Sequence, residues 1–295
     1  MHSARTCVIV VNYRGAADTA ACIRSLLASA APAAIVLVDT SPNDPELESA
    51  IAFAPGVKLL RPPENLGFGG GNNLGIEWAL KSADCEYIFL LNNDAVVLPD
   101  TISELESAMQ LDPSIGICAP RIAFMDRPDR LWYGGGAIDW RRSSAFTPGF
   151  GGDAEAPLAM MERDVTFATG CALFLRRSAA EKLEGFDPRF FMYEEDVELC
   201  LRAREHRIRI RYIPRCLIFH RAQGSTRKTS GEWDDFWSVR NPRLPFYAFH
   251  VLRNRALNIY LHARGWDWIT ARFFFLSFWC AALSRSCGED VSTLC

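Results

Sequence analysis

The first residues that could do chemistry stand at the end of an apolar run. Residues 87–91 read YIFLL, which favours a strand buried on both sides, and Asn92, Asn93 and Asp94 follow directly. A carboxylate at the tip of such a strand is costly to desolvate without a partner. Asn and Asp also favour plain turns and helix caps. This stretch alone therefore leaves a functional site and an ordinary turn both open.

A second acidic group, Glu194, Glu195 and Asp196, follows the aromatic residues at 190–193. Crowded carboxylates beside an aromatic surface can have a pKa raised toward values that suit a general base. Acidic residues are also favoured at a helix N-terminus, because they complement the helix dipole. For Glu194 alone we prefer this second interpretation.

His220 ends the apolar run CLIFH. A lone histidine in such a place is more often structural than a ligand. If it meets Asp94 in space, however, one carboxylate and one imidazole could hold Mg²⁺ or Mn²⁺.

A glycine-rich stretch, ENLGFGGGNNLG, occupies residues 64–75. Its glycines would let the backbone approach a phosphate or a ribose, and a helix N-terminus follows at 72. The stretch departs from GxGxxG, because Asn72 replaces the third glycine, and it follows the third strand instead of the first. A dinucleotide site is therefore weakly supported, and a mobile loop remains the alternative.

The elements that position these residues alternate between strand and helix in the first half of the chain. This alternation predicts a parallel sheet with helices on both faces, whose ligands bind beyond the carboxyl ends of the strands. Four of the expected strands end in polar residues: Asn12, Asp39, Arg61 and 92–94. Asp18 and Asp44 are expected to cap helices. The expected strands are 6–12, 33–39, 57–62, 87–92 and 115–124, and the expected helices are 18–29, 43–53, 72–83 and 99–111.

The second half has a different pattern. Residues 132–153 are rich in glycine and aromatics, which indicates a loop or an irregular hairpin. Beyond them we expect a strand at 165–177 interrupted by glycine, helices at 178–187 and 194–207, and two short strands at 208–214 and 216–220. No repeat or linker is evident, so one continuous fold is expected.

Composition narrows the class of protein. The 295 residues are 49% hydrophobic and 23% charged, which suits a soluble globular chain. The net charge of −3 gives no basic field for nucleic acid. The ten cysteines form no CxxC pair, which favours buried reduced thiols in a cytosolic protein. Residues 1–6 lack the hydrophobic core of a signal peptide.

The C-terminal region carries an apolar run at 273–283 that is too short to span a membrane, since a spanning helix needs about 20 residues. Trp266, Trp268 and Trp279, interspersed with arginines, could anchor an amphipathic segment at a membrane surface. A helix packed on the body explains the same pattern equally well. Arg253 or Arg255, in the expected helix 246–260, could reach a phosphate, although a solvated helix face explains each of them too.

An ordered set of motifs resembles the family 2 glycosyltransferases, and most closely the bacterial rhamnosyltransferase-like branch that builds cell-surface polysaccharides. The resemblance runs from about residue 6 to 226. The motifs are VIVVNYR, VDTSPND, ENLGFGGGNN, LLNNDAV, FATGCALFLRR, GFDPRFFMYEEDVELCLR and IPRCLIFHRAQGST.

The resemblance implies an α/β chain with the GT-A fold of nucleotide-diphospho-sugar transferases, in which a mostly parallel sheet is flanked by helices. The implied glycosyltransferase domain is 1–235, with a nucleotide-sugar-binding half at 1–125 and an acceptor and catalytic half at 126–235. Residues 236–295 would form a C-terminal helical segment that could associate with a membrane.

The resemblance also implies roles for particular residues. Asp196 would be the catalytic base, paired with Glu195, and Asp94 would hold Mg²⁺ or Mn²⁺ with His220 as a metal or diphosphate contact. Asp39 would contact the nucleobase. Thr169, Gly170 and the glycine-rich loop 134–153 would border the acceptor. The other implied donor contacts are Asn12, Asn65, Gly67, Asn72, Asn92 and Asn93.

Two departures from the family pattern bear on the donor. Asn92 replaces the first acid of the metal motif, and Thr40 stands where Asn usually follows the VD pair. The first departure weakens the expected ribose contact, and the second leaves the base selectivity open.

The resemblance implies an inverting, metal-dependent hexosyltransferase that moves a sugar from a nucleotide-diphosphate donor to a glycan or lipid-linked acceptor. By resemblance, dTDP-rhamnose is the first donor to consider, and UDP- or GDP-sugars follow. The expected location is the cytoplasm, with peripheral contact at the inner face of the membrane left open. Two alternatives remain: a non-catalytic sugar-nucleotide-binding component of a polysaccharide assembly complex, and a nucleotidyltransferase. The second is disfavoured because residues 12–19 lack a glycine-rich basic loop.

Overall fold

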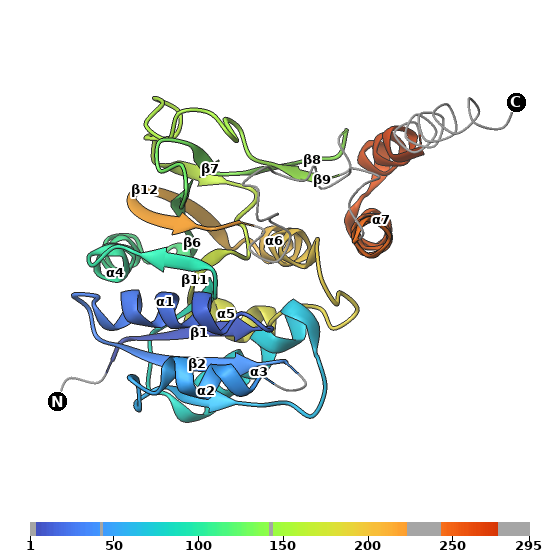
Figure 1. Ribbon diagram of the computed structural model, residues 1–295. Helices are drawn as coiled ribbons and strands as arrows, with labels where there is room; N and C mark the ends of the chain where they lie inside the picture. Colours follow the sequence, from blue (N-terminus) through green and yellow to red (C-terminus); the bar gives the residue numbers. More distant parts are fainter. Residues whose placement is uncertain (1–3, 42–43, 142–143, 223–242, 277–295) are drawn as a thin grey trace, which may run out of the picture.

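The order of the elements follows the expected alternation of strand and helix through the first half of the chain. The computed structural model describes residues 4–41, 44–141, 144–222 and 243–276 (Figure 1). The strands are β1 (Thr6–Asn12), β2 (Ala33–Asp39), β3 (Lys58–Leu60), β4 (Tyr87–Asn92), β5 (Ala95–Val97), β6 (Ile115–Phe124), β7 (Leu131–Tyr133), β8 (Ala137–Asp139), β9 (Ser144–Phe146), β10 (Arg163–Val165), β11 (Ala172–Arg176) and β12 (Arg209–His220). The helices are α1 (Ala16–Leu27), α2 (Pro45–Ile51), α3 (Gly67–Ser82), α4 (Thr101–Leu111), α5 (Arg177–Leu183), α6 (Glu195–Glu205) and α7 (Leu244–His262).

One central sheet contains most of the strands, in the order β10-β12-β6-β11-β4-β1-β2-β3, with β5 added to β12 and β7 added to β6. The neighbouring strands among β1 to β4 are all parallel, as the sequence predicts. In the second half β11 lies antiparallel between β4 and β6, and β12 runs parallel to β6. The sheet is therefore mixed, and β8 and β9 form a separate hairpin.

The alternation of side chains along β1 explains why helices cover both faces. On one face Ile9 and Val11 lie against Gly75 and Gly71 of α3. On the other face Thr6 donates a hydrogen bond to Glu106 of α4, and Asn12 accepts one from α1. Successive side chains of a strand point to opposite faces, so α1 and α4 cover one face and α3 the other. The helices α5 and α6 follow α3 on its side of the sheet.

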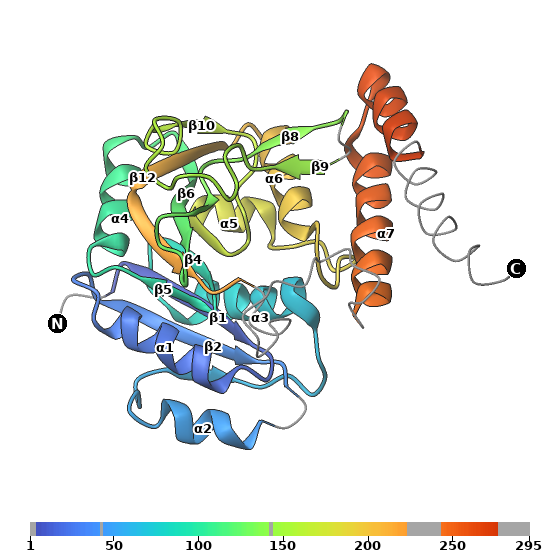
Figure 2. The same ribbon diagram turned by 45° about the horizontal axis from the view of Figure 1, so that its top comes forward.

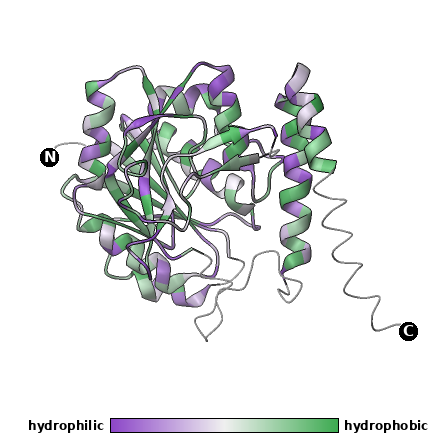
Figure 3. Cartoon of the chain, turned by 90° about the horizontal axis from the view of Figure 1, so that it is seen from above, coloured by the Kyte–Doolittle hydropathy of each residue, from purple (hydrophilic) through white to green (hydrophobic). Residues whose placement is uncertain are grey.

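The core is built from the apolar strands themselves. The side chains of β1, β2 and β4 are almost all buried, which agrees with the uninterrupted apolar runs in the sequence. In Figure 3 much of the sheet inside the body is coloured green, which marks hydrophobic residues. Seven cysteines of the described residues are free and buried, consistent with the expected reduced thiols.

Four local expectations are wrong. The helix expected from residue 72 begins at Gly67, so the glycine-rich stretch is helical. The strand expected at 165–177 is two strands, β10 and β11, which pair with different neighbours. The two strands expected at 208–220 are one, β12, with an irregularity between Ile213 and Leu217. The short strand β5, which directly follows the Asn92–Asp94 turn, is missing from the expectations.

Of the two expected helix caps, Asp44 is confirmed in position, before Pro45 at the start of α2, and Asp18 is wrong. Gly15 precedes α1, and the Asp18 carboxylate pairs with Arg221 at 2.8 Å. Asp44 does precede α2, but its carboxylate makes no capping hydrogen bond and accepts one from Asn12 instead. In both cases a tertiary partner competes successfully with the local cap.

Helix α7 stands at the side of the body next to α6 (Figures 1 and 2). A second helical stretch follows it at 265–276. Among the described helices, none is both long enough and apolar enough to cross a membrane. Trp279 and the end of the apolar run 273–283 lie outside the described residues.

Candidate active site

Asn12 is the centre of a buried hydrogen-bond network at the carboxyl ends of the first strands. Register places it beside Asp39, and its neighbour Val11 beside Asn92, so the predicted convergence of these strand ends is confirmed. The Asn12 side chain is fully buried. Its Nδ2 donates to Asp39 Oδ1 at 2.9 Å, and its Oδ1 accepts from Thr19 Oγ1 at 2.9 Å. Asn12 therefore holds the Asp39 carboxylate in place from within the protein.

Asp39 is held from several sides. Oδ1 also accepts from the Ser41 amide at 3.1 Å, and Oδ2 accepts from Arg61 Nε at 3.4 Å. The carboxylate is 1% exposed, whereas Arg61 is 43% exposed. Arg61 thus covers the carboxylate that is expected to meet the nucleobase, and the solvent-facing group at this strand edge is the guanidinium.

The Asn92–Asp94 turn lies next to His220, and this contact is the condition that the sequence analysis set for a metal role of the histidine. Antiparallel pairing sets Ala95 of β5 opposite His220 at the end of β12. Asp94 Oδ1 lies 2.9 Å from His220 Nε2. Asn92 Nδ2 lies 3.5 Å from the same nitrogen. Asn93 turns toward the Asn12 network instead, donating to Thr19 Oγ1 at 3.0 Å.

The Asp94 and His220 side chains fit a divalent cation only in part. Burial by itself would lower the pKa of His220, but the adjacent Cys171 side chain and the Asp94 carboxylate outweigh burial and raise it to about 10. A metal bound to Nε2 would have to displace that proton. The described residues hold no cluster of three or more His, Cys, Asp or Glu side chains that could bind a metal. The donor set therefore fits Mg²⁺ or Mn²⁺ when a diphosphate supplies further oxygens.

The turn at Thr169–Cys171 connects the two candidate aspartates. The Gly170 amide donates to Asp196 Oδ2 at 2.9 Å. The Asn92 amide donates to the Cys171 carbonyl at 2.8 Å. Burial raises the pKa of the Cys171 thiol, and the charges of both Asp94 and Asp196 contribute to the rise. Asp94 and Asp196 therefore flank the same turn, although they are about a hundred positions apart in the sequence.

Asp196 lies in the first turn of α6, after Glu195. Burial raises its pKa to about 6, the nearby charge of Glu194 adds to the rise, and the Gly170 amide opposes it. Burial and the charge of Asp196 together raise the pKa of Glu195 well above its usual value. A carboxyl group with a pKa of about 6 is suited to accept a proton at neutral pH.

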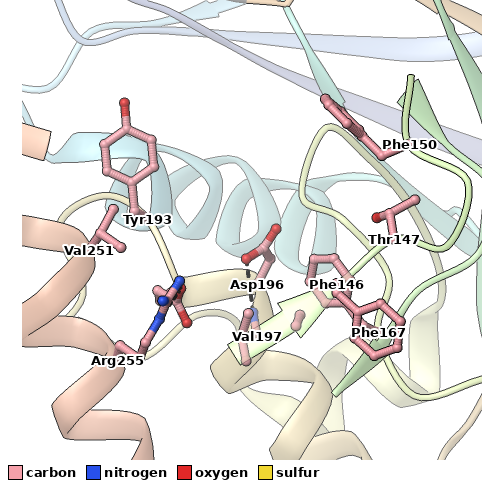
Figure 4. Close-up of a pocket in the computed structure, with 11 residues that line it drawn as sticks. Phe146, Thr147, Phe150, Phe167, Tyr193, Asp196, Val197, Val251 and Arg255 are labelled. Atoms are coloured by element: carbon pink, nitrogen blue, oxygen red, sulfur yellow. Dashed lines mark hydrogen bonds and ion pairs between the residues drawn. The ribbon is translucent and has the colours of Figure 1, made fainter. Parts of the chain in front are cut away.

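Asp196 lines a pocket of about 350 Å³. Figure 4 shows its carboxylate between two walls. One wall carries Tyr193 together with Val251 and Arg255 of α7 (Figure 4). The other wall carries Phe146, Thr147 and Phe150 from the segment around β9, and Phe167. The lining residues are Ala145, Phe146, Thr147, Phe150, Phe167, Tyr193, Glu194, Asp196, Val197, Val251 and Arg255. Asp94 is not among them.

The glycine-rich stretch packs against the chain that leads to Asp196. Gly67 has φ +69°, and a Cβ there would lie 2.1 Å from the Phe191 carbonyl oxygen. The Phe68 amide donates to that oxygen at 3.0 Å, and Asn65 Oδ1 accepts from the Gly67 amide at 2.9 Å. A glycine is needed at 67 because the Phe191 loop of the protein itself lies against the start of α3. The close approach that glycine allows is therefore used by the protein, and not only by a ligand.

The asparagines that follow these glycines have different roles. Asn72, an expected donor contact, is 2% exposed and donates to the Phe68 carbonyl within its own helix. Asn73 reaches the Phe186 backbone with both ends of its carboxamide, at 2.7 and 2.8 Å.

Both arginines considered for a phosphate role make contacts within the protein. Arg255 Nη2 lies 2.8 Å from Glu194 Oε1, and Arg253 Nη1 donates to the Arg189 carbonyl at 2.9 Å.

Several site residues lie outside the sequence predictions. Thr19, Asn73 and the pocket aromatic Phe167 carry no local signal for a site, whereas Phe146 and Phe150 lie in the loop 134–153 that was expected to border the acceptor. The spacing of Asn254 and Asn258 offered one, because two asparagines four positions apart in an apolar helix lie on the same face.

The comparisons with known proteins show that the chain is a glycosyltransferase. The profile of Glycosyl transferase family 2 matches residues 7–184, and the chain belongs to that family. Among solved structures, GalNAc-T7 with UDP, GalNAc and Mn²⁺ has a TM-score of 0.57 at 17% identity, covering 74% of this chain and 44% of that one. Staphylococcus aureus TarS (residues 1–349) has a TM-score of 0.56 at 12% identity, covering 93% and 72%. These neighbours confirm the GT-A fold.

The curated relatives narrow the branch. The chain is 28% identical over 239 residues to N-acetylglucosaminyl-diphospho-decaprenol L-rhamnosyltransferase of Mycobacterium tuberculosis, covering 74% of this chain and 76% of the relative. It is 26% identical to rhamnosyltransferase WbbL of Escherichia coli K12, covering 55% and 63%. The predicted family and its rhamnosyltransferase-like branch are confirmed, and with them a glycosyltransferase of glycan synthesis.

Proposed function

We propose that the protein transfers a hexose, with rhamnose as the first candidate, from a nucleotide-diphosphate donor to a hydroxyl of a lipid-linked glycan, with inversion at C1. The observation that carries this proposal is the placement of Asp196. Its carboxylate faces the pocket, and the Gly170 amide holds it on the turn that separates it from Asp94 and His220.

The proposed reaction uses the two aspartates on the two sides of the sugar. Asp196 accepts the proton of the acceptor hydroxyl while that oxygen attacks C1 and the bond from C1 to the diphosphate oxygen breaks. A single displacement inverts C1. Asp94 and His220 are the residues that would hold Mg²⁺ or Mn²⁺. The ion would neutralise the charge that develops on the departing diphosphate. Burial and the charge of Glu194 keep the pKa of the base high, and the charge of Asp196 in turn helps to raise the pKa of Glu195.

The pocket is proposed to bind the acceptor. Phe146, Phe150, Phe167 and Tyr193 present aromatic surface near Asp196. Apolar and aromatic walls with a few placed polar groups are typical of small-ligand sites. A pyranose ring can rest its C–H face on such rings while one hydroxyl reaches the carboxylate. Thr169 and Gly170 do not line this pocket, and Gly170 is connected with it through its hydrogen bond to Asp196.

On the donor side we propose that the nucleotide lies at the edge formed by β1, β2 and β4. Arg61 and Asp39 would meet the base, and the Asn92–Asp94 turn would meet the ribose and diphosphate. Asn65, Gly67 and Asn72 support this edge through α3. The names of the relatives support dTDP-rhamnose as the first donor to test, and UDP- and GDP-sugars as the next. The boundary of the transferase domain is proposed at 235, with the two halves divided at 125.

A lipid-linked acceptor would bring the enzyme to a membrane surface, and we propose a cytoplasmic enzyme with peripheral contact at the inner face. The helical stretch after α7 supports this, because Trp266, Ile269 and Phe273 are 82%, 51% and 65% exposed. Arg264 and Arg272 flank them, as in interfacial amphipathic segments. Co-sedimentation with anionic lipid vesicles tests the contact, and Trp266→Ser should reduce binding.

The central experiment is Asp196→Asn, which keeps the shape of the side chain and removes the base. Turnover of dTDP-L-rhamnose with N-acetylglucosaminyl-diphospho-decaprenol should fall by about 10²–10⁴-fold. Donor binding, measured as a thermal shift with Mg²⁺, should persist. A variant that retains parental turnover would refute the role of Asp196. A parent that binds the donor but never transfers or hydrolyses it would favour the non-catalytic alternative, and release of pyrophosphate would favour a nucleotidyltransferase.

A further inference from the structure

The backbone that leads into Asp196 adopts an unusual conformation. Tyr193 and Glu194 both have φ +66°, in the left-handed region, and neither is glycine. Each such residue costs about 1–3 kcal/mol and persists only where surrounding contacts enforce it. Because Glu194 directly precedes α6, these two residues fix where the helix begins and where its first turn points.

The enforcing contacts come from α7. Asn254 is fully buried, and its Nδ2 donates to the Met192 carbonyl at 2.9 Å and to the Tyr193 carbonyl at 2.7 Å. Asn258 is 2% exposed, and its Nδ2 donates to the Glu194 carbonyl at 3.1 Å. Two carboxamides one helical turn apart thus donate hydrogen bonds to three successive backbone carbonyls, those of Met192, Tyr193 and Glu194.

The same helix is attached to α6 by other groups. His262 Nδ1 lies 3.0 Å from Glu205 Oε1, and His262 Nε2 lies 3.4 Å from the buried Glu198. Arg255 pairs with the Glu194 carboxylate. The docking of α7 therefore does not rest on the two asparagines alone.

We propose that Asn254 and Asn258 of α7 are positioning residues for Asp196, acting by holding the backbone of Tyr193 and Glu194 in its left-handed conformation. The inference rests on the proposed role of Asp196 as the base. It extends the working site beyond the family profile, which ends at residue 184, to a helix some sixty positions downstream of the base.

The test uses Asn254→Leu, which keeps the approximate volume of the side chain and removes its donor. The Gly170 amide reports the position of Asp196 without any substrate, because the Asp196 carboxylate is its hydrogen-bond acceptor. Exchange of that amide with solvent, followed by NMR, should accelerate by about tenfold or more, while the amides of β1 and β4 keep their parental rates. Asn258→Leu, which loses one hydrogen bond to the 192–194 backbone instead of two, should give the same pattern with a smaller change.

Kinetics provide the second readout. With dTDP-L-rhamnose and N-acetylglucosaminyl-diphospho-decaprenol, Asn254→Leu should lower kcat by about 10–100-fold and leave the donor KM within about threefold, since a small misplacement of a catalytic group affects the chemical step. Phe249→Ala is the matched control on α7, because Phe249 is 61% exposed and makes none of these contacts. It should match the parent in both readouts.

Different results would refute the positioning role of the two asparagines and the role of Asp196 as the base. Parental Gly170 exchange in Asn254→Leu would overturn the positioning role, and so would acceleration spread equally over β1 and β4, which would mean general destabilisation. If Asp196→Asn retained turnover, the base assignment itself would fall, whatever the asparagine variants did.

Discussion

The two halves of the site are stabilised in opposite ways. At the proposed donor edge, the Asn12 side chain forms hydrogen bonds with Gly15, Thr19, Asp39 and Ser41, all within 29 positions of it along the chain. On the Asp196 side, Asn73 of α3 donates a hydrogen bond to Phe186, 113 positions away. Asn254 of α7 donates one to Tyr193, 61 positions away. The difference shows that strand register alone can assemble the first half, whereas the second half needs separate elements to converge.

This contrast predicts that damage to the donor edge reduces stability, whereas damage on the Asp196 side reduces activity. The largest effect is expected for Asn12→Leu. It removes the buried hydrogen bonds that Asn12 makes with Asp39, Thr19 and the Gly15 amide, at about 1–3 kcal/mol for each group left unsatisfied. Urea unfolding should show a loss of about 3 kcal/mol or more. A loss under 1 kcal/mol would mean that the network is not what holds these strand ends.

A binding effect of similar size is expected for Asp94→Ala. Loss of the carboxylate should weaken Mg²⁺-dependent binding of dTDP-L-rhamnose by about 100-fold, as charged contacts in such sites contribute about 1.5–3 kcal/mol. Titration calorimetry with and without Mg²⁺ measures it. Asp126→Ala is a control outside the site. Unchanged affinity would remove Asp94 from the donor site.

The glycine that joins the two halves should have an intermediate effect. Gly67→Ala places a Cβ against the Phe191 carbonyl at a positive φ, a conformation that costs about 1–2 kcal/mol for a residue with a side chain. We expect a stability loss of about 2 kcal/mol or more and a lower kcat, because the displaced Phe191 precedes the base. Gly56→Ala is the control, since a Cβ there meets nothing within 4 Å. Equal stability of the two variants would contradict the close packing.

The smallest effect concerns pH. Asp196 must be ionised to act as a base and its pKa is about 6, so kcat should fall about tenfold per pH unit below 6 and level off above it. Because the folded-state pKa is raised, Asp196 contributes in the opposite sense to stability, which it lowers as pH rises from about 4 to 6. A pH–rate profile in which kcat is flat from pH 5 to 7 would contradict this assignment of the base.

Sequence patterns predicted the strands of the first half closely, because each is an uninterrupted apolar run between polar ends. Those patterns were less reliable where a tertiary contact competes with a local preference. Asp44 looks like a cap but binds Asn12, and the glycines at 67–71 look like a loop but start a helix against Phe191. The strand β5 was missed because it has only three residues and pairs with β12, far along the chain.

The sequence by itself determined the family, the parallel core and the edge where Asn12, Asp39 and Asn92 meet, because parallel strands necessarily end on the same side of a sheet. Only the tertiary structure decided that Asp196 shares a turn with Asp94, and that two asparagines of α7 hold the backbone in front of it. Those contacts join residues with no local relation, and their stabilisation comes from satisfying buried carbonyls that only the assembled fold brings within reach.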